Sequence, residues 1–273
     1  VSQVIAAIDW VVEHKNDDGL NIRVLNLSFG TDSSQSYLVD PLAHAVERAW
    51  KAGIVVVVAS GNDGNTSPLR NPATSPFVIA VGASEGNMSY DAADDDLTPF
   101  SSCGTAARPV DVVAPGKSIV SLRAFGASAD VDHPEAMLGG RFFLGSGTSQ
   151  ASAVVSGAAA LIIEQRPTIT PDQVKELLTR TAQQIPGVST ACQGAGLIDL
   201  KEARDTSTPS SWAARQPFTP STGTGSLDAA RGTVIVELDG EKLTGERDVF
   251  GNDFDSAEHA EATAQGTSWS DGE

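Results

Sequence analysis

Apolar residues recur at the spacing of an amphipathic helix in three segments of the chain. The first covers residues 4–15 and the second residues 41–53, where Pro41 lies in the first turn and Gly53 ends the segment. The third begins at TPDQVKELL, whose Thr170 is followed by a proline and, three residues on, by a glutamine. Because that order forms a capping box, the sequence predicts the start of a helix at this threonine.

Four further apolar segments predict strands. They are VLNLSF, IVVVVAS, FVIAVGA and VDVVAPG, at residues 24–29, 54–60, 77–83 and 110–116. The last three are unbroken runs rich in β-branched residues, and such runs are buried on both faces, as in a parallel sheet. Since strands alternate with helices along the chain, the sequence predicts an α/β protein with a doubly wound parallel sheet.

The composition changes near residue 200, which predicts two parts, residues 1–200 and residues 201–273. The second part opens with ARDTSTPSSWAARQPFTPSTGTG, whose serine, threonine and proline content is typical of a linker. GTVIVELDGEKLTG then alternates apolar and polar residues around Asp239 and Gly240, which predicts a small hairpin. Residues 259–273 are predicted to be disordered.

The formal net charge is −17, so the chain lacks the excess of Lys and Arg that nucleic acid and anionic membranes attract. We therefore expect neither of them as a partner. No apolar run is long enough to cross a bilayer, and the opening residues VSQVIAAIDWVV lack the basic start of a signal peptide. Cys103 and Cys192 can form one disulfide or remain free, and their spacing matches no metal site.

A serine lies where a loop gives way to the small and apolar residues of GSGTSQASAVVSGAAALI. Ser149 follows Gly147 and Thr148 and opens a predicted helix, whose positive end favours a developing oxyanion. The alternative is that Ser149 only caps this helix. The pattern differs from the G-x-S-x-G elbow, because Ala151 stands where the last glycine would be.

Two strand ends supply further candidates, because ligands of parallel sheets gather at the carboxyl ends of the strands. Asn62, in the turn ASGNDG, can donate a side-chain N–H into such a site, and the alternative is an ordinary turn asparagine. VLNLSFG also ends at a strand terminus, where Ser28 and Gly30 are free to pair with an extended peptide.

Five blocks, in this order, resemble those of the subtilisin-like serine peptidases, or subtilases: VLNLSFG, VVVVASGNDG, NPATSPFVIAVGA, FSSCGTAARPVDVVAPG and GSGTSQASAVVSGAAALI. The resemblance covers roughly residues 1–200 and implies a subtilisin-like doubly wound parallel sheet, incomplete at its N-terminal side. The sequence departs from the family pattern at Ala153 and Val154, where proline and often histidine are usual. The tail, with ARGTVIVELDG, LTGERDVFG and SWS, resembles the tails of secreted actinobacterial subtilases.

The resemblance implies a role for each matched position. Ser149 would be the acylated nucleophile, and Asn62 would be the oxyanion-hole donor, paired with the backbone N–H of Ser149. The remaining matched residues would bind substrate, some as an added strand and some as walls of the pocket for the side chain just before the scissile bond. The strand residues would be Ser28, Phe29 and Gly30, and the wall residues Ala59, Ser60 and Gly61.

The D-T/S-G and H-G-T blocks that carry the family's aspartate and histidine do not occur in the sequence. The four histidines, His14, His44, His133 and His259, are predicted to be solvated surface residues. We therefore expect the C-terminal part of a subtilase catalytic domain, with the Asp and His on a complementary N-terminal segment. Alone, it would keep only residual catalysis and would fold poorly, because VLNLSF would form an exposed parallel edge.

The resemblance thus implies a secreted serine endopeptidase that acts on protein or peptide substrates by acyl transfer and without a cofactor. The alternatives are a peptide-binding pseudopeptidase that kept the groove and lost the base, and an inactive gene fragment. Many subtilases bind calcium, but DAADDD, residues 91–96, lacks an EF-hand pattern and is predicted to be a solvated loop, so no metal site is assigned. Asp63, next to Asn62, would favour a basic substrate side chain.

Overall fold

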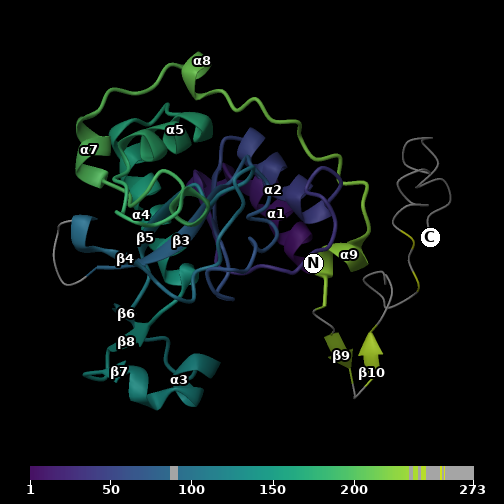
Figure 1. Cartoon of the computed structure of the whole chain (residues 1–273). Coiled ribbons are helices and arrows are strands. Elements are labelled where there is room, and N and C mark those ends of the chain that lie inside the picture. The colour runs from purple at the N-terminus through teal and green to yellow at the C-terminus, as the bar shows by residue number, and fades with distance from the viewer. Residues whose placement is uncertain (87–91, 234–235, 239–240, 244–252, 254, 256–273) are drawn as a thin grey trace.

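Four parallel strands lie at the centre of the structure (Figure 1). Their order in the sheet is β1, β2, β3, β5. Their bounds are Val24–Leu27, Val55–Ala59, Ile79–Glu85 and Val112–Pro115. The short strand β4 (Asp96–Leu97) pairs antiparallel with the end of β3. This computed structural model describes residues 1–86, 92–233, 236–238, 241–243, 253 and 255. The predicted α/β class with a parallel sheet is confirmed.

Helices cover the sheet, and all five residues of β2 are buried. Helix α4 contacts all four parallel strands, whereas α2 packs on β2 and α1 packs on α2. The bounds are α1 (Ser2–His14), α2 (Pro41–Lys51), α4 (Thr148–Gln165) and α5 (Pro171–Thr181). Helix α5 begins with the predicted capping box of Thr170 and Gln173. Within the described residues, no helix has the length and hydropathy that a membrane crossing requires.

Strand β1 lies at one edge of the sheet. It pairs with β2, and no second strand partner is found for it among the described residues. Its first two residues, Val24 and Leu25, are half-buried, and Asn26 is exposed. The expectation that this edge impairs folding of the isolated chain stays a prediction.

The chain between β5 and α4 forms an antiparallel sheet in the order β6, β8, β7, which extends away from the main sheet (Figure 1). Its strands are β6 (Ile119–Leu122), β7 (Met137–Leu138) and β8 (Phe142–Gly145), accompanied by α3 (Ser128–Asp132) and the 3-10 turn η3 (Pro134–Ala136). Two further 3-10 turns are η1 (Asp17–Gly19) and η2 (Ala92–Asp94).

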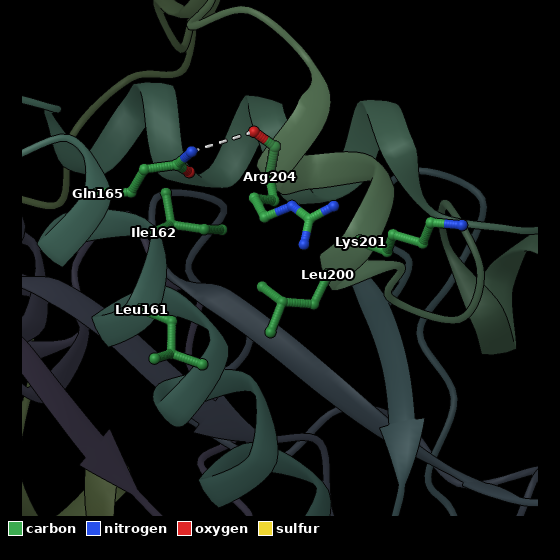
Figure 2. A pocket seen from close by; sticks show the side chains of 6 residues that line it. All are labelled: Leu161, Ile162, Gln165, Leu200, Lys201 and Arg204. Atoms are coloured by element: carbon green, nitrogen blue, oxygen red, sulfur yellow. Dashed lines mark hydrogen bonds between the residues drawn. The ribbon is translucent and has the colours of Figure 1, made fainter.

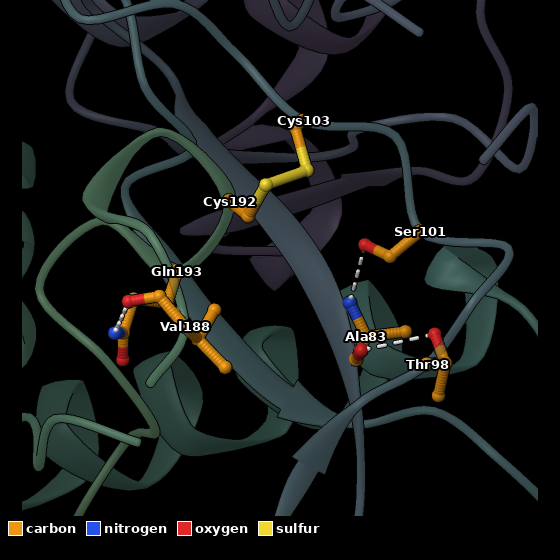
Figure 3. The surroundings of a disulfide bond; sticks show 7 residues. All are labelled: Ala83, Thr98, Ser101, Cys103, Val188, Cys192 and Gln193. Carbon is orange, nitrogen blue, oxygen red and sulfur yellow. Dashed lines mark hydrogen bonds between the residues drawn. A yellow bond between two sulfur atoms is a disulfide. The ribbon is translucent and has the colours of Figure 1, made fainter. Parts of the chain in front are cut away.

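Cys103 and Cys192 form a disulfide (Figure 3), which resolves the alternative that the sequence left open. It joins the segment after β4 to the short helix α6 (Thr190–Gln193) across a sequence separation of 89 residues. Close to Cys103, the Ser101 hydroxyl accepts a hydrogen bond from the backbone of Ala83 in β3. The disulfide therefore links α6 to a segment that is anchored on the central sheet.

The polar segment predicted as a linker lies against the domain, and we call residues 206–233 the strap (Figure 1). The Gln216 amide donates to the backbone of Phe77, and the backbone N–H of Thr222 donates to Leu38 O at 2.8 Å. Helix α7 (Leu200–Asp205) precedes the strap, and the short helices α8 (Ser211–Ala214) and α9 (Leu227–Arg231) lie within it. The division of the chain into residues 1–200 and 201–273 stays a prediction.

Beyond the strap, β9 (Val236–Leu238) and β10 (Glu241–Leu243) pair antiparallel, as the predicted hairpin requires. The turn residues, Asp239 and Gly240, lie outside the described residues, and so does the segment 259–273 that was predicted to be disordered.

Loss of the disulfide should destabilise the fold, because the cross-link restricts the unfolded chain over a long loop. We expect the double variant Cys103→Ala, Cys192→Ala to lose about 2–5 kcal/mol of unfolding free energy in urea titrations. Dithiothreitol should lower the stability of the wild type and leave the double variant unchanged. Equal stability of the reduced and oxidised wild type would contradict this.

The strap is also held by a buried carboxylate. Glu47 in α2 is 1% exposed and accepts hydrogen bonds from the N–H of Ser221 at 2.7 Å and from the Ser75 hydroxyl at 2.9 Å. Burial raises the pKa of Glu47, and this effect outweighs the lowering by the two hydrogen bonds. At pH values between the pKa of Glu47 in the unfolded state and its higher pKa in the folded state, the native state binds more protons than the unfolded state. Glu47 therefore lowers the free energy of unfolding as the pH rises through that window.

We therefore expect Glu47→Gln to be more stable than the wild type at pH 7. The amide removes the buried charge, can still accept from Ser221 and can donate to Ser75. The difference in unfolding free energy should shrink below about pH 4, where glutamate is largely protonated in both states. Glu13→Gln, on the exposed face of α1, is the matched control. A stability loss that is the same at both pH values would show that the charge is not the cause.

Candidate active site

The segments that follow β1 and β2 meet the start of α4 at the carboxyl edge of the sheet. Between them lies a pocket of about 380 Å³. It brings together most of the residues that the sequence selects, and it adds several others. The lining residues are Ser28, Phe29, Gly30, Asp32, Ala59, Gly61, Asn62, Asp63, Arg70, Thr148, Ser149 and Thr233.

Ser60 is the one predicted pocket residue that does not line this cavity. Its side chain is fully buried, and its hydroxyl has no hydrogen-bond partner in the described part of the chain. The residue contributes through its backbone, because its N–H donates to Val81 O and its carbonyl accepts from the N–H of Arg70. Ser60 thus holds the pocket wall on β3 while its neighbours face the cavity.

Thr148 fixes the side-chain amide of Asn62. The backbone N–H of Thr148 donates to Asn62 Oδ1 at 2.9 Å, and its hydroxyl lies 3.0 Å from the same oxygen. The hydroxyl also contacts both the N–H and the carbonyl of Gly61. Because the amide oxygen is engaged on the helix side, the Nδ2 group of Asn62 is left to face the cavity. This role of Thr148 could not be predicted from the sequence, because Asn62 lies 86 residues away.

Two N–H donors therefore remain unused at the start of α4. Within the described residues, no acceptor is found for Asn62 Nδ2 or for the backbone N–H of Ser149. The first N–H groups of a helix lack partners inside the helix and favour an anion there. Gly147, the residue before α4, has φ 157° and ψ 163°, a conformation essentially confined to glycine. Its N–H donates to Gly116 O at 2.8 Å.

The Ser149 hydroxyl is half-buried and donates to the backbone carbonyl of Ser28 at 3.3 Å. The Ser28 hydroxyl in turn donates to the Ser149 carbonyl at 3.1 Å, so the ends of β1 and α4 are tied together on both sides. The acceptor of the Ser149 proton is thus a carbonyl, which is not a base.

No histidine lines the pocket among the described residues. His14 lies at the end of α1, and His133 is exposed in the segment between α3 and η3. His14 and His44 are both half-buried, and His44 Nδ1 lies 2.9 Å from the carbonyl of Ser221 in the strap, so the prediction of solvated residues is wrong for these two. His259 lies outside the described residues.

An ionic cluster occupies one side of the pocket. Arg70 Nε donates to the carboxylate of Asp63 at 2.7 Å, and its Nη1 lies 3.8 Å from that of Asp32. The hydrogen bond from Arg70 lowers the pKa of Asp63, and hydrogen bonds from Thr233 lower that of Asp32. Asp63 is therefore already paired inside the chain, which the sequence could not show because Arg70 lies outside its turn.

A second pocket of about 440 Å³ lies between the end of α4 and α7 (Figure 2). Its lining is mainly aliphatic, and Gln165 bridges it by donating to the carbonyl of Arg204. It contains none of the residues selected from the sequence. It is also remote from Ser149, which lies at the opposite end of α4.

The described residues contain no group of three or more His, Cys, Asp or Glu side chains that could hold a metal ion. In the run 91–96, Asp91 lies outside the described residues, whereas Asp94 is exposed and Asp95 is buried. The absence of a cofactor and the unassigned calcium site stay predictions.

The fold and the site define an α/β protein with a serine and two unpaired N–H donors at the carboxyl edge of a parallel sheet. The chain belongs to the subtilase family, Peptidase S8, whose sequence model matches residues 1–207. Serine protease AprX of Bacillus subtilis is 35% identical over 210 residues, and subtilisin of Bacillus pumilus is 34% identical over 205 residues. The matches cover 74% of this chain but only 48% and 62% of these two relatives.

Solved structures give the same result. Fervidolysin from Fervidobacterium pennivorans, described as a keratinolytic enzyme related to subtilisin, has a TM-score of 0.59 and 30% identity. It covers 76% of this chain, and the chain covers 29% of it. A protease from Pseudoalteromonas arctica has a TM-score of 0.58 and 26% identity, with 75% of this chain and 58% of that chain covered. The predicted subtilisin-like fold is thereby confirmed.

Replacing Thr148 should loosen the contact between β2 and α4. Thr148→Val keeps the shape of the side chain but removes the hydroxyl from Asn62 and from both the N–H and the carbonyl of the half-buried Gly61. We expect a loss of about 1–3 kcal/mol in urea denaturation. Thr148→Ser, which retains the hydroxyl, is the matched control and should lose less. An unchanged stability of Thr148→Val would contradict the role of the hydroxyl, and a larger loss in Thr148→Ser than in Thr148→Val would show that the methyl group contributes more.

Proposed function

We propose that this chain carries the nucleophile and the oxyanion-binding half of a serine endopeptidase site. The observation that supports this best is the convergence of two unpaired donors, Asn62 Nδ2 and the N–H of Ser149, beside the Ser149 hydroxyl. Such preorganised donors stabilise the negative charge that develops on a carbonyl oxygen under attack. The family membership of residues 1–207 is consistent with that role.

In the proposed reaction Ser149 Oγ attacks the carbonyl carbon of the scissile peptide bond, and a base takes the hydroxyl proton. The two donors hold the oxyanion until the C–N bond breaks and the leaving amine receives the proton from the protonated base. Water then attacks the acyl-serine ester while the base takes its proton, and the proton passes to Ser149 Oγ as the acid product leaves. No histidine lines the pocket among the described residues, and its carboxylates, Asp32 and Asp63, are paired with Arg70, so we propose that an aspartate and a histidine come from a complementary N-terminal segment.

The substrate would bind along the end of β1 as an added strand. Gly30 is exposed, and its backbone makes no hydrogen bond to another described residue. Ser28 and Phe29 follow β1 in the chain and line the pocket, together with Ala59 and Gly61 at the end of β2. A side chain entering there from the substrate would lie next to the Ser149 hydroxyl, as cleavage after that residue requires.

We further propose that the protein acts outside the cell on proteins or peptides and needs no cofactor for acyl transfer. The Cys103–Cys192 disulfide supports an oxidising compartment. The bacterial relatives are proteases by name, which supports proteins or peptides as substrates.

A catalytically inactive peptide-binding protein, the product of a decayed or partial gene, is the alternative. Its specific support is that Ser149 donates to a carbonyl and that no histidine is found in the pocket within the described residues. Such a protein would bind extended peptides in the same groove without acylation.

Covalent labelling separates these two proposals. We expect a small fluorophosphonate to label Ser149 when the chain is co-expressed with the N-terminal segment of a related subtilase, and far more slowly without it. Asn62→Ala should slow labelling of the complemented chain by about 10²–10³, a magnitude measured for turnover on subtilisin itself. Ser156→Ala, on α4 but outside the pocket, is the matched control and should react normally.

Absence of labelling in the complemented, folded chain would reject the endopeptidase proposal. Peptide binding without labelling would then favour the inactive binding protein. Labelling at an equal rate without the segment would instead show that the chain contains its own base.

A further inference from the structure

Arg70 forms the floor of the pocket beside Ser149. Its N–H donates to Ser60 O at 2.9 Å, which fixes its Cα against the pocket wall. Its Cβ lies 2.4 Å from the point that a Cβ on Gly30 would occupy, and its Cγ lies 2.7 Å from the corresponding point at Gly61. The aliphatic part of Arg70 therefore fills the space that these two glycines leave open between the strand ends.

The guanidinium of Arg70 is held in place across the pocket. Nε donates to Asp63, and Nη1 faces the carboxylate of Asp32. Asp32 is itself held by the strap, since the N–H of Thr233 donates to it at 2.8 Å and the Thr233 hydroxyl donates to its second oxygen. A long substrate side chain could enter only by displacing an arginine that has two ion-pair partners.

The charges in this cluster oppose both kinds of charged side chain. A lysine or arginine of the substrate would meet the guanidinium of Arg70 at the floor, and an aspartate or glutamate would meet the carboxylates of Asp32 and Asp63. Asp63 alone would favour a cation, as the sequence predicts, but its ion pair with Arg70 reduces that attraction.

We propose that Arg70 is the specificity-determining residue of this site and restricts the substrate residue before the scissile bond to short, uncharged side chains. The steric part comes from its stem, between Gly30 and Gly61, and the electrostatic part from its guanidinium. This inference rests on the proposed function in one respect, that the pocket beside Ser149 receives that substrate residue.

The test uses non-covalent binding, which does not depend on the nucleophile. N-acetylated tetrapeptides that differ only in their last residue, Ala, Phe, Lys or Glu, mimic the acyl product, and calorimetry measures their affinity for the folded full chain. The free carboxylate common to all four can contact the donors at Ser149 and Asn62. For the wild type we expect the Ala peptide to bind roughly tenfold or more tightly than the other three.

Two variants separate size from charge. Arg70→Gly should raise the affinity of both the Phe and the Lys peptides about tenfold relative to the Ala peptide, because the floor opens and two carboxylates lose their partner. Arg70→Met keeps a long stem, so it should raise the affinity for the Lys peptide and leave the affinity for the Phe peptide low. Arg48→Met, at an exposed position on α2, should leave the order unchanged.

Equal affinities of the wild type for the Ala and Phe peptides would overturn the proposal, and so would an unchanged order in Arg70→Gly. Should Arg70→Gly fail to fold, the Arg70→Met variant decides. An affinity of this variant for the Lys peptide that stays as low as that of the wild type would contradict the electrostatic role of Arg70. Fluorophosphonate labelling, run in parallel, reports on the proposed function alone. A preference for the Ala peptide without any labelling would uphold the role of Arg70 and reject the endopeptidase.

Discussion

The parallel register of β1 and β2 is the constraint on which the site depends. Leu27 pairs with Val58, so the two strands end at the same edge of the sheet and the segments that follow them lie side by side. Helix α4 packs on all four parallel strands and begins at that same edge, where Gly147 is bonded to the segment after β5. Because side chains alternate along a strand, a slip of one residue in β1 would bring Asn26, which is exposed, to the position of the buried Leu27, so burial of the core also fixes the site.

Buried polar contacts then determine the shape of the loops at this edge. Asp40, only 1% exposed, is a single carboxylate that joins the start of α2 to two loops of the pocket wall. Its donors are the N–H groups of Leu42 and Ala43, the side-chain amides of Asn71 and Gln35, and the hydroxyl of Ser33. A buried carboxylate is stable when its lone pairs are satisfied in this way, and its loss would free both loops together. The position of Arg70, next to Asn71, is thus set by a group outside the pocket.

The sequence predicts the parts of this structure that follow from local pattern. The β-branched runs are strands, Thr170 caps α5, and Ser149 and Asn62 lie in one pocket, because strand ends and helix starts are marked by short-range signals. The contacts that it did not predict are those that only folding creates. Arg70 reaches the pocket by pairing its backbone with Ser60, ten residues earlier, and Thr148 acts through a side chain 86 residues away. Nor could spacing decide the disulfide, since its two cysteines meet only when α6 lies against the segment after β4.

The same short-range structure explains how the two unpaired donors can be present in a pocket that has no histidine among the described residues. The two donors at Asn62 and Ser149 are products of the strand end, the helix start and Thr148, all of which lie in this chain. The Ser149 hydroxyl is held only by a neutral hydrogen bond of 3.3 Å to Ser28, and such bonds contribute about 0.5–1.5 kcal/mol. Turning the hydroxyl toward an incoming imidazole therefore costs little compared with the gain from general-base catalysis, which is typically 10²–10⁴-fold.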